Sequence, residues 1–307
     1  MTVSPDLHLP DASSRRWPAP RGLLRLTKPV TWFPPMWAYL CGIVSAGISP
    51  WDRWPLVVLG VVLAGPVVCG MSQVINDWAD RDVDAINEPH RPIPSGMVSP
   101  GWAFAFAVLL SGLSLWLGSF LGIWGLGATA VAVVAAWVYS VPPFRLKRSG
   151  WWGPGLVGLS YESLPWFTGA AVLSVGAPSF PVVIVALLYG IGAHGIMTIN
   201  DFKALEGDRA TGVRSLPVVV GPDVAARIAC MVMTLPQLLV ISMLVVWGQP
   251  VFAAVVALGL IGQFAAMRVW MRDPAGKAPW YNGTGVTLYV LGMMVSAVAI
   301  RSLGVAP

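Results

Sequence analysis

The sequence predicts an all-α integral membrane protein, a bundle of nine transmembrane helices around a central cavity that opens toward the cytoplasmic side. Three observations indicate this fold class. The mean hydropathy is +0.71, and the chain has 56% hydrophobic and only 11% charged residues, far from the composition of soluble domains. Apolar stretches near twenty residues recur along the chain. Lys and Arg gather at alternate ends of these stretches.

Each expected span is long enough to cross about 30 Å of hydrocarbon as a helix. The spans cover residues 30–48, 56–76, 101–120, 122–141, 154–174, 180–200, 224–247, 250–270 and 284–303. Tyr161, Glu162 and Pro165 interrupt the fifth span.

The basic residues predict the orientation of the chain. When successive loops are assigned to alternate sides, seventeen of the nineteen Lys and Arg residues fall on one side, and only Arg53 and Arg301 on the other. The positive-inside rule places that side, with the N-terminus, in the cytoplasm and the C-terminus opposite. The net charge of +5 therefore reflects topology, and no basic stripe with base-stacking aromatics indicates nucleic-acid binding. Residues 1–28 are expected to form a poorly ordered cytoplasmic tail, because they lack an apolar core and a cleavage site.

The first acidic cluster follows the second span and runs from Asn76 to Arg91. Five of the chain's fourteen acidic residues fall within twelve positions here. On a helix with about 100° per residue, Asp77, Asp80 and Asp84 share a sector of roughly 60°. Like charges at this spacing destabilise an isolated helix, so the pattern indicates a compensating cation. Oxygen ligands with no nearby Cys favour Mg²⁺ over Zn²⁺.

A second acidic cluster follows the sixth span, 124 residues later, and has the same features. Asp201 and Asp208 repeat the seven-residue separation of Asp77 and Asp84, although Ala204 stands where the first cluster has Asp80. Each cluster is followed by an arginine, Arg91 in the first and Arg214 in the second. We interpret the repeat as two half-sites that together hold a metal-bound polyanion.

Further candidate residues lie at the end of the fourth span and inside the fifth and sixth. Arg145, Lys147 and Arg148 either serve topology and lipid headgroups or neutralise a diphosphate, to which Tyr139 is placed to donate a hydrogen bond. An ionisable group such as Glu162 inside an apolar span is costly and should face the bundle interior. His194 either ligates a metal held by a macrocycle or is satisfied by a neighbouring helix.

These patterns favour a substrate with a diphosphate head and a hydrophobic tail, such as an isoprenyl diphosphate. Mg²⁺ prefers one or two carboxylates together with substrate phosphates, and the clusters lie at the membrane surface beside an apolar interior. Metal and arginine would stabilise the charge that develops as the allylic carbon–oxygen bond breaks. A cation or metabolite transporter is the alternative from another class, but transporter carboxylates usually lie near the midplane of the bilayer.

The two acidic motifs and the nine expected spans resemble the UbiA superfamily of intramembrane prenyltransferases. Residues 84–96 and 200–209 resemble its chlorophyll synthase branch, and residues 161–169 and 192–198 resemble the members of that branch that make bacteriochlorophyll. The similarity covers about residues 20–305, which makes residues 29–307 the expected UbiA-like transmembrane domain.

The resemblance implies that geranylgeranyl or phytyl diphosphate esterifies the propionate of bacteriochlorophyllide a, with Mg²⁺ as cofactor and release of diphosphate. Chlorophyllide, a quinone precursor and haem are alternative acceptors. A propionate is already ionised at neutral pH and needs no general base, and the sequence has no obvious one. Implied partners are membrane lipids and other pigment-biosynthesis or assembly proteins, in an inner, photosynthetic membrane.

The resemblance also implies roles for individual residues. The catalytic carboxylates would be Asp77, Asp80, Asp84, Asp201 and Asp208. The metal ligands would be Asn76, Asp77, Asp80, Asp84, Asn200, Asp201, Glu206 and Asp208. The diphosphate would contact Arg91, Tyr139, Lys147, Arg148, Lys203 and Arg214, while Glu162 and His194 would lie on the acceptor side.

Overall fold

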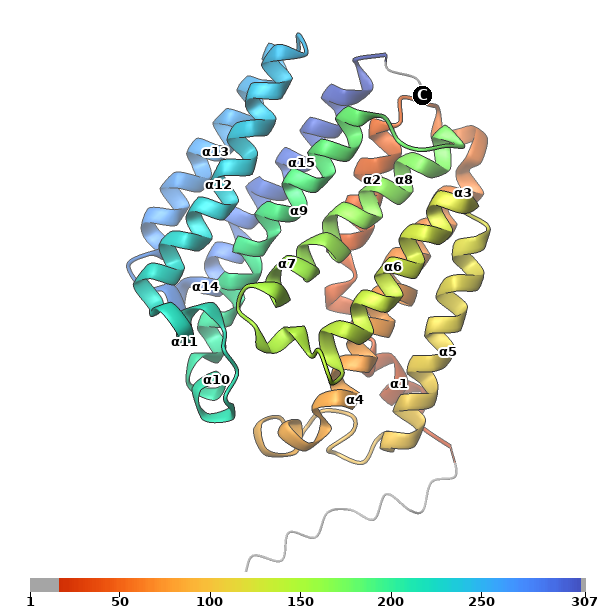
Figure 1. Ribbon diagram of the computed structural model, residues 1–307, viewed down its shortest axis with the longest axis vertical. Helices are drawn as coiled ribbons and strands as arrows, with labels where there is room; N and C mark the ends of the chain where they lie inside the picture. The colour runs from red at the N-terminus through yellow and green to blue at the C-terminus, as the bar shows by residue number, and fades with distance from the viewer. Residues whose placement is uncertain (1–16, 305–307) are drawn as a thin grey trace, which may run out of the picture.

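The computed structural model describes residues 17–304 as a bundle of helices, most of which run along the long axis of the molecule (Figure 1). The all-helical fold agrees with the sequence-based expectation. The first half contains α1 (Pro20–Leu26), α2 (Phe33–Ser45), α3 (Trp54–Val62), α4 (Gly70–Asn87), α5 (Pro100–Ser119) and α6 (Gly122–Ser140). The second half contains α7 (Trp152–Gly158), α8 (Leu164–Ser174), α9 (Phe180–Asp201), α10 (Leu205–Thr211), α11 (Leu216–Val220), α12 (Pro222–Val246), α13 (Pro250–Trp270), α14 (Pro274–Gly283) and α15 (Gly285–Arg301).

Short segments of tighter or wider helix connect several of these elements. The 3₁₀ turns are η2 (Pro29–Thr31), η3 (Pro50–Arg53), η5 (Leu146–Arg148) and η7 (Phe202–Ala204). Two π-helical segments, η4 (Leu63–Cys69) and η6 (Leu159–Ser163), join α3 to α4 and α7 to α8 without a break in the helix. Pro66 lies inside η4, where a missing amide donor favours such a local rearrangement.

Within residues 17–304, seven helices are long and apolar enough to cross a membrane. They are Pro50–Asn87, Pro100–Ser119, Gly122–Ser140, Phe180–Thr211, Pro222–Val246, Pro250–Trp270 and Pro274–Arg301. The expected spans at 30–48 and 154–174 are not among them. The first holds α2, which has only 13 residues because Pro34 and Pro35 allow the helix to begin only at Phe33. The second is divided among α7, η6 and α8.

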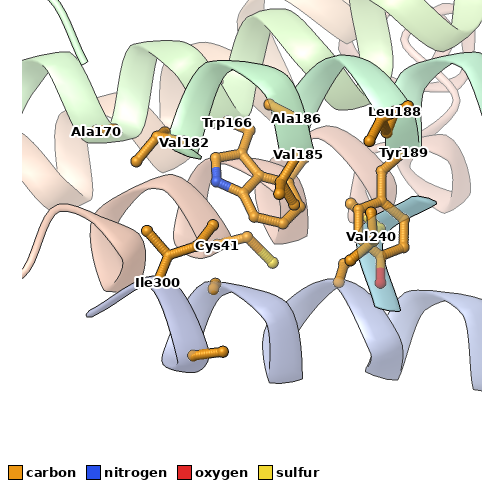
Figure 2. Packing of buried hydrophobic residues seen from close by; sticks show 14 of the residues in the cluster. Cys41, Trp166, Ala170, Val182, Val185, Ala186, Leu188, Tyr189, Val240 and Ile300 are labelled. Atoms are coloured by element: carbon orange, nitrogen blue, oxygen red, sulfur yellow. The ribbon is translucent and has the colours of Figure 1, made fainter. Parts of the chain in front are cut away.

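The hydrophobic core lies where α2, α8, α9, α12 and α15 meet (Figure 2). Trp166 of α8 stacks on Tyr189 of α9, with ring centroids 5.7 Å apart. Gly42 of α2 lies against the backbone of Trp166 and Ala170, so that a side chain at this position would collide with α8. Small residues therefore allow α2 and α8 to pack closely.

Both acidic segments lie at the same end of the bundle. In Figure 1 the C-terminal part of α4 and the short helix α10 are both at the lower end, as are α1, α11 and α14. Part of the expected N-terminal tail is folded here: α1 packs against α4, and Leu26 is fully buried because its side chain joins the core around Met71. Residues 1–16 of that expected tail lie outside the described residues.

Candidate active site

Asp77 and Asp84 of the first acidic cluster lie on one face of the continuous helix α4. Nη1 of Arg91 is 3.3 Å from Oδ1 of Asp77 and 2.8 Å from Oδ2 of Asp84, which shows that these two carboxylates share a face, as the spacing predicts. Burial alone would lower the pKa of Arg91, but Asp77 and Asp84 outweigh burial and raise this pKa. The guanidinium therefore stays charged beside the cluster.

Lys28 is a member of this site that the sequence-based assignment missed. Its Nζ lies 2.7 Å from Oδ1 of Asp77, whose side chain is only 2% exposed. Lys28 adopts a left-handed backbone conformation with φ of 44°, which turns the chain between α1 and η2. The sequence does contain one indication of this role. Lys28 lies just before the first apolar stretch, on the side of the membrane where Asp77 is also predicted to lie.

Asp80 is held by the loop that follows α6. Nη2 of Arg145 lies 2.9 Å from Oδ1 of Asp80, and Nζ of Lys147 lies 2.6 Å from Oδ2. Burial lowers the pKa of Lys147, although the neighbouring Asp80 acts in the opposite direction. Lys147 is among the residues assigned to the diphosphate, whereas Arg145 was considered only as one of three cations that could neutralise it.

The second acidic cluster has a different local structure from the first. α9 ends at Asp201, η7 follows, and Asp208 lies on the separate helix α10, so the seven-residue spacing does not run along one helix. Asp201 is half-buried and lies within electrostatic reach of Asp208. Lys203 and Glu206 are exposed, and among the described residues neither forms an ion pair.

The loop after α6, which holds Asp80, also contacts the chain at the end of α10 and beyond it. The backbone amide of Gly150 donates to the carbonyl oxygen of Arg214 at 2.7 Å. The backbone amide of Arg214 in turn donates to the carbonyl oxygen of Arg148 at 3.0 Å. Nη2 of Arg148 donates to the carbonyl oxygen of Thr211 at 3.1 Å. Arg148 and Arg214 line a separate hollow of ≈ 400 Å³ outside the main cavity.

A mostly apolar cavity of ≈ 380 Å³ extends into the bundle from this end. Asn76 of α4 and Asn200 of α9, the residues directly before the first aspartate of each cluster, both line it. Tyr139 at the end of α6 lines it as well and lies within electrostatic reach of both Asp80 and Asp201. The cavity therefore reaches both half-sites. Its apolar lining includes Pro34, Pro35, Ala64, Val68, Ala132, Ala135, Ala136, Leu156, Val157, Ile196, Met197, Val286 and Val290.

Glu162 and His194 have different surroundings. Glu162 is buried, lines the cavity, and its Oε2 has no hydrogen-bond partner in the part of the chain that the structure describes. Nε2 of His194 lies 3.1 Å from the carbonyl oxygen of Trp151, and Nδ1 lies 3.5 Å from Oγ1 of Thr198. These contacts give His194 a structural role between α9 and the start of α7, whereas Glu162 faces the interior as predicted.

Comparison with known proteins identifies the family. The model of the UbiA prenyltransferase family matches residues 32–294. The chain belongs to the UbiA prenyltransferase family.

Two solved structures with this fold have low sequence identity to this chain. A structure of digeranylgeranylglyceryl phosphate synthase has a TM-score of 0.70 at 23% identity and covers 91% of this chain and 98% of that one. A UbiA homologue from Archaeoglobus fulgidus bound to GPP and Mg²⁺ has a TM-score of 0.62 at 19% identity, covering 92% and 98%.

Curated members of the UbiA family show much higher sequence identity. The bacteriochlorophyll synthase 33 kDa chain of Cereibacter sphaeroides is 65% identical over 307 residues, which is the full length of both chains. The corresponding 33 kDa chain of Rhodobacter capsulatus is 64% identical and covers 95% of this chain and 97% of its own. The chloroplastic chlorophyll synthase of Arabidopsis thaliana is more distant, at 38% identity over 90% of this chain and 73% of its own.

Proposed function

We propose that the protein esterifies the propionate of a bacteriochlorophyllide with the prenyl group of geranylgeranyl or phytyl diphosphate and releases diphosphate. The observation that carries this proposal is the single apolar cavity lined by both Asn76 and Asn200, beside both acidic segments. The full-length identity of 65% to a bacteriochlorophyll synthase chain supports the choice of acceptor.

The cavity and its surroundings suit a prenyl diphosphate. The apolar lining would take the prenyl chain, and the end beside α4 and α9 would take the diphosphate. Four cations lie within ion-pair distance of Asp77, Asp80 or Asp84 and can also balance a diphosphate: Lys28, Arg91, Arg145 and Lys147. Tyr139 would donate a hydrogen bond from inside the cavity. Arg148, Lys203 and Arg214 would act from outside it, as part of the wider basic surface.

The side chains present fit a Mg²⁺ ion that is shared with the substrate. Among residues 17–304, no three His, Cys, Asp or Glu side chains gather closely enough to form an all-protein metal cage. Mg²⁺ typically uses only one or two carboxylates together with phosphate oxygens, so a cage is not required. Oδ2 of Asp77 is buried and has no partner within the described chain, which leaves one oxygen free for such a ligand. We propose Asp77, Asp80, Asp84, Asp201 and Asp208 as the carboxylates, assisted by Asn76 and Asn200, with Glu206 placed further out.

The reaction requires the chain to position two substrates and to stabilise a leaving group. An oxygen of the propionate forms a bond to the allylic carbon while the bond from that carbon to diphosphate breaks, and the diphosphate leaves with the electron pair. Arg91 and Lys147 would stabilise the charge that develops on the leaving oxygen, and bound Mg²⁺ would supply further electrostatic stabilisation. The apolar cavity would exclude water, which competes for the reactive carbon. Glu162 and His194 would lie on the acceptor side, Glu162 within the cavity and His194 behind it.

We also propose a nine-span topology for residues 29–307 in the inner, photosynthetic membrane, with the cavity open to the cytoplasm. The two spans beyond the seven long helices would be α2 and the α7–α8 segment, which run lengthwise beside the longer helices in Figure 1. The basic residues near both acidic segments support the orientation. Association with other pigment-biosynthesis or assembly proteins remains a prediction.

An acceptor assay tests the proposed function. Purified protein in lipid nanodiscs would receive Mg²⁺, geranylgeranyl or phytyl diphosphate, and one acceptor at a time. We expect an ester of bacteriochlorophyllide a, with chlorophyllide a a poorer acceptor. Product formed only with 4-hydroxybenzoate or haem would reject the proposed acceptor. Metabolite flux across proteoliposomes without any prenyl transfer would reject the enzyme altogether.

A further inference from the structure

A polar patch lies inside the cavity, apart from the acidic clusters. Nε2 of Gln73, on α4, lies 2.9 Å from the hydroxyl oxygen of Tyr161, on η6, and both side chains line the cavity. Gln73 is four residues before Asp77, so it lies about one helical turn, or roughly 5–6 Å, deeper in the bundle. Ser72, Asn76, Ser160 and Glu162 also line the cavity, and most of the remaining lining is apolar.

The pair leaves a hydrogen-bond donor free for a ligand. Gln73 donates to the oxygen of Tyr161. Among the described residues, the proton of Tyr161 can reach only the hydroxyl of Ser72, at a long 3.5 Å, and the sulfur of Cys69 at 3.4 Å, which is a weak acceptor. Ser72 itself donates to the carbonyl oxygen of Cys69 at 2.7 Å. If the amide of Gln73 is turned over, Tyr161 donates to it and the amide nitrogen becomes free instead. In either orientation, at least one donor is available to the cavity.

Two departures from regular α-helix lie at or beside this pair. η6 carries Tyr161 and η4 ends at Cys69, whose Sγ lies 3.4 Å from the hydroxyl of Tyr161. A π-helical turn displaces side chains from their usual α-helical positions, and such turns frequently occur at functional sites. The interruption of the expected fifth span by Tyr161 and Glu162 therefore corresponds to a segment that presents polar groups to the cavity.

A positive charge lies nearby. Lys28, which pairs with Asp77 at 2.7 Å, also acts electrostatically on Cys69 beside the patch. A carboxylate bound at Gln73 and Tyr161 would therefore have at least one neutral donor in contact and one cation close by. Buried carboxylates require this combination of hydrogen bonds and charge compensation.

We propose that Gln73 and Tyr161 bind the carboxylate of the acceptor and hold it one helical turn from the diphosphate site. This inference rests on the proposed function, because it names the subsite for the acceptor of that reaction. One carboxylate oxygen accepts hydrogen bonds from the pair, and the other is left to form the bond to the allylic carbon as the diphosphate leaves. The position fits, because the reacting carbon must lie between the carboxylate and the diphosphate.

Equilibrium binding of a non-reacting acceptor tests this subsite directly. Pigment fluorescence would report binding of bacteriochlorophyllide a, and of its propionamide, to full-length protein in nanodiscs without prenyl diphosphate. We expect wild type to bind the carboxylate about tenfold or more tightly than the amide. Tyr161→Phe and Gln73→Met should lose most of this preference. In turnover assays both variants should raise the KM for the acceptor and leave the KM for prenyl diphosphate unchanged.

Tyr189→Phe is the matched control, because it removes a buried phenolic hydroxyl that bonds to Ser296 in the core (Figure 2). It should retain the preference of the wild type. If Tyr161→Phe fails to fold, Gln73→Met tests the same donor pair. Unchanged preference in both folded variants, with an active wild type, would overturn the subsite alone. A wild type that neither binds nor esterifies the pigment would instead overturn the proposed function.

Discussion

Lys147 Nζ lies 2.6 Å from Oδ2 of Asp80, and this contact attaches the loop after α6 to the acidic face of α4. The same loop pairs through its backbone with Arg214, beyond the second acidic segment. One short basic segment therefore contacts both halves of the site. These contacts support the proposal that two acidic motifs 124 residues apart in the chain serve one diphosphate.

Asp80→Asn should lower turnover roughly 100-fold or more, because it removes a carboxylate from the group that would hold the metal and the leaving diphosphate. Membrane insertion and folded yield should be unaffected, since Asp80 lies on the polar face near the end of α4. Asp82→Asn is the matched control, as Asp82 is 86% exposed and points away from the site. Equal activity in the two variants would contradict the assignment of Asp80.

Lys147→Gln should raise the KM for prenyl diphosphate about 10- to 100-fold, the usual cost of losing a hydrogen bond to a charged group. The KM for the acceptor should stay the same, because Lys147 lies on the loop outside the apolar cavity. Steady-state kinetics with each substrate varied in turn would measure both constants. Lys277→Gln, a charge change near the start of α14, serves as the control and should leave both unchanged.

His194→Ala should destabilise the fold by about 1–3 kcal/mol, because it leaves the carbonyl oxygen of Trp151 without its 3.1 Å partner. Thermal unfolding followed by tryptophan fluorescence would show a lower midpoint temperature. His90→Ala provides the comparison, since His90 is 73% exposed in a loop. An unchanged midpoint in His194→Ala would contradict this structural role.

Gly42→Ala should also destabilise the protein, by about 1–3 kcal/mol, because the added methyl group would collide with the backbone of α8 at Trp166 and Ala170. Gly112→Ala, on α5, has open space around the new carbon and should be neutral or slightly stabilising. Thermal unfolding of the two variants side by side would measure the difference. Equal stability would show that α2 and α8 pack less closely than described.

The sequence contains enough information for the fold class and for the first half-site. Apolar length and helical spacing are local properties, so the expected spans at 56–76 and 101–120 and the shared face of Asp77 and Asp84 follow from them. The second half-site was harder to anticipate, because its seven-residue spacing matches the first in sequence while η7 interrupts the helix between Asp201 and Asp208. Equal spacing did not produce equal geometry.

The contacts that depend on tertiary packing were not accessible from the sequence. In the sequence, Lys28 belongs to a polar tail, and only the packing of α1 against α4 brings it to Asp77. Arg145 differs from Arg148 only in position within one basic run, yet the turn of the loop directs Arg145 to Asp80 and Arg148 to Thr211. The orientation of Tyr161 toward Gln73 depends on a π-helical segment, which no apolar periodicity reveals.

The most direct test of the account is Mg²⁺-dependent binding of geranylgeranyl diphosphate to wild type, Asp80→Asn, Asp208→Asn and the double variant. If both acidic segments hold one diphosphate, each single variant should bind at least about tenfold more weakly. The loss in the double variant should then differ from the sum of the single losses. Wild-type affinity in Asp208→Asn at every Mg²⁺ concentration would contradict the shared site.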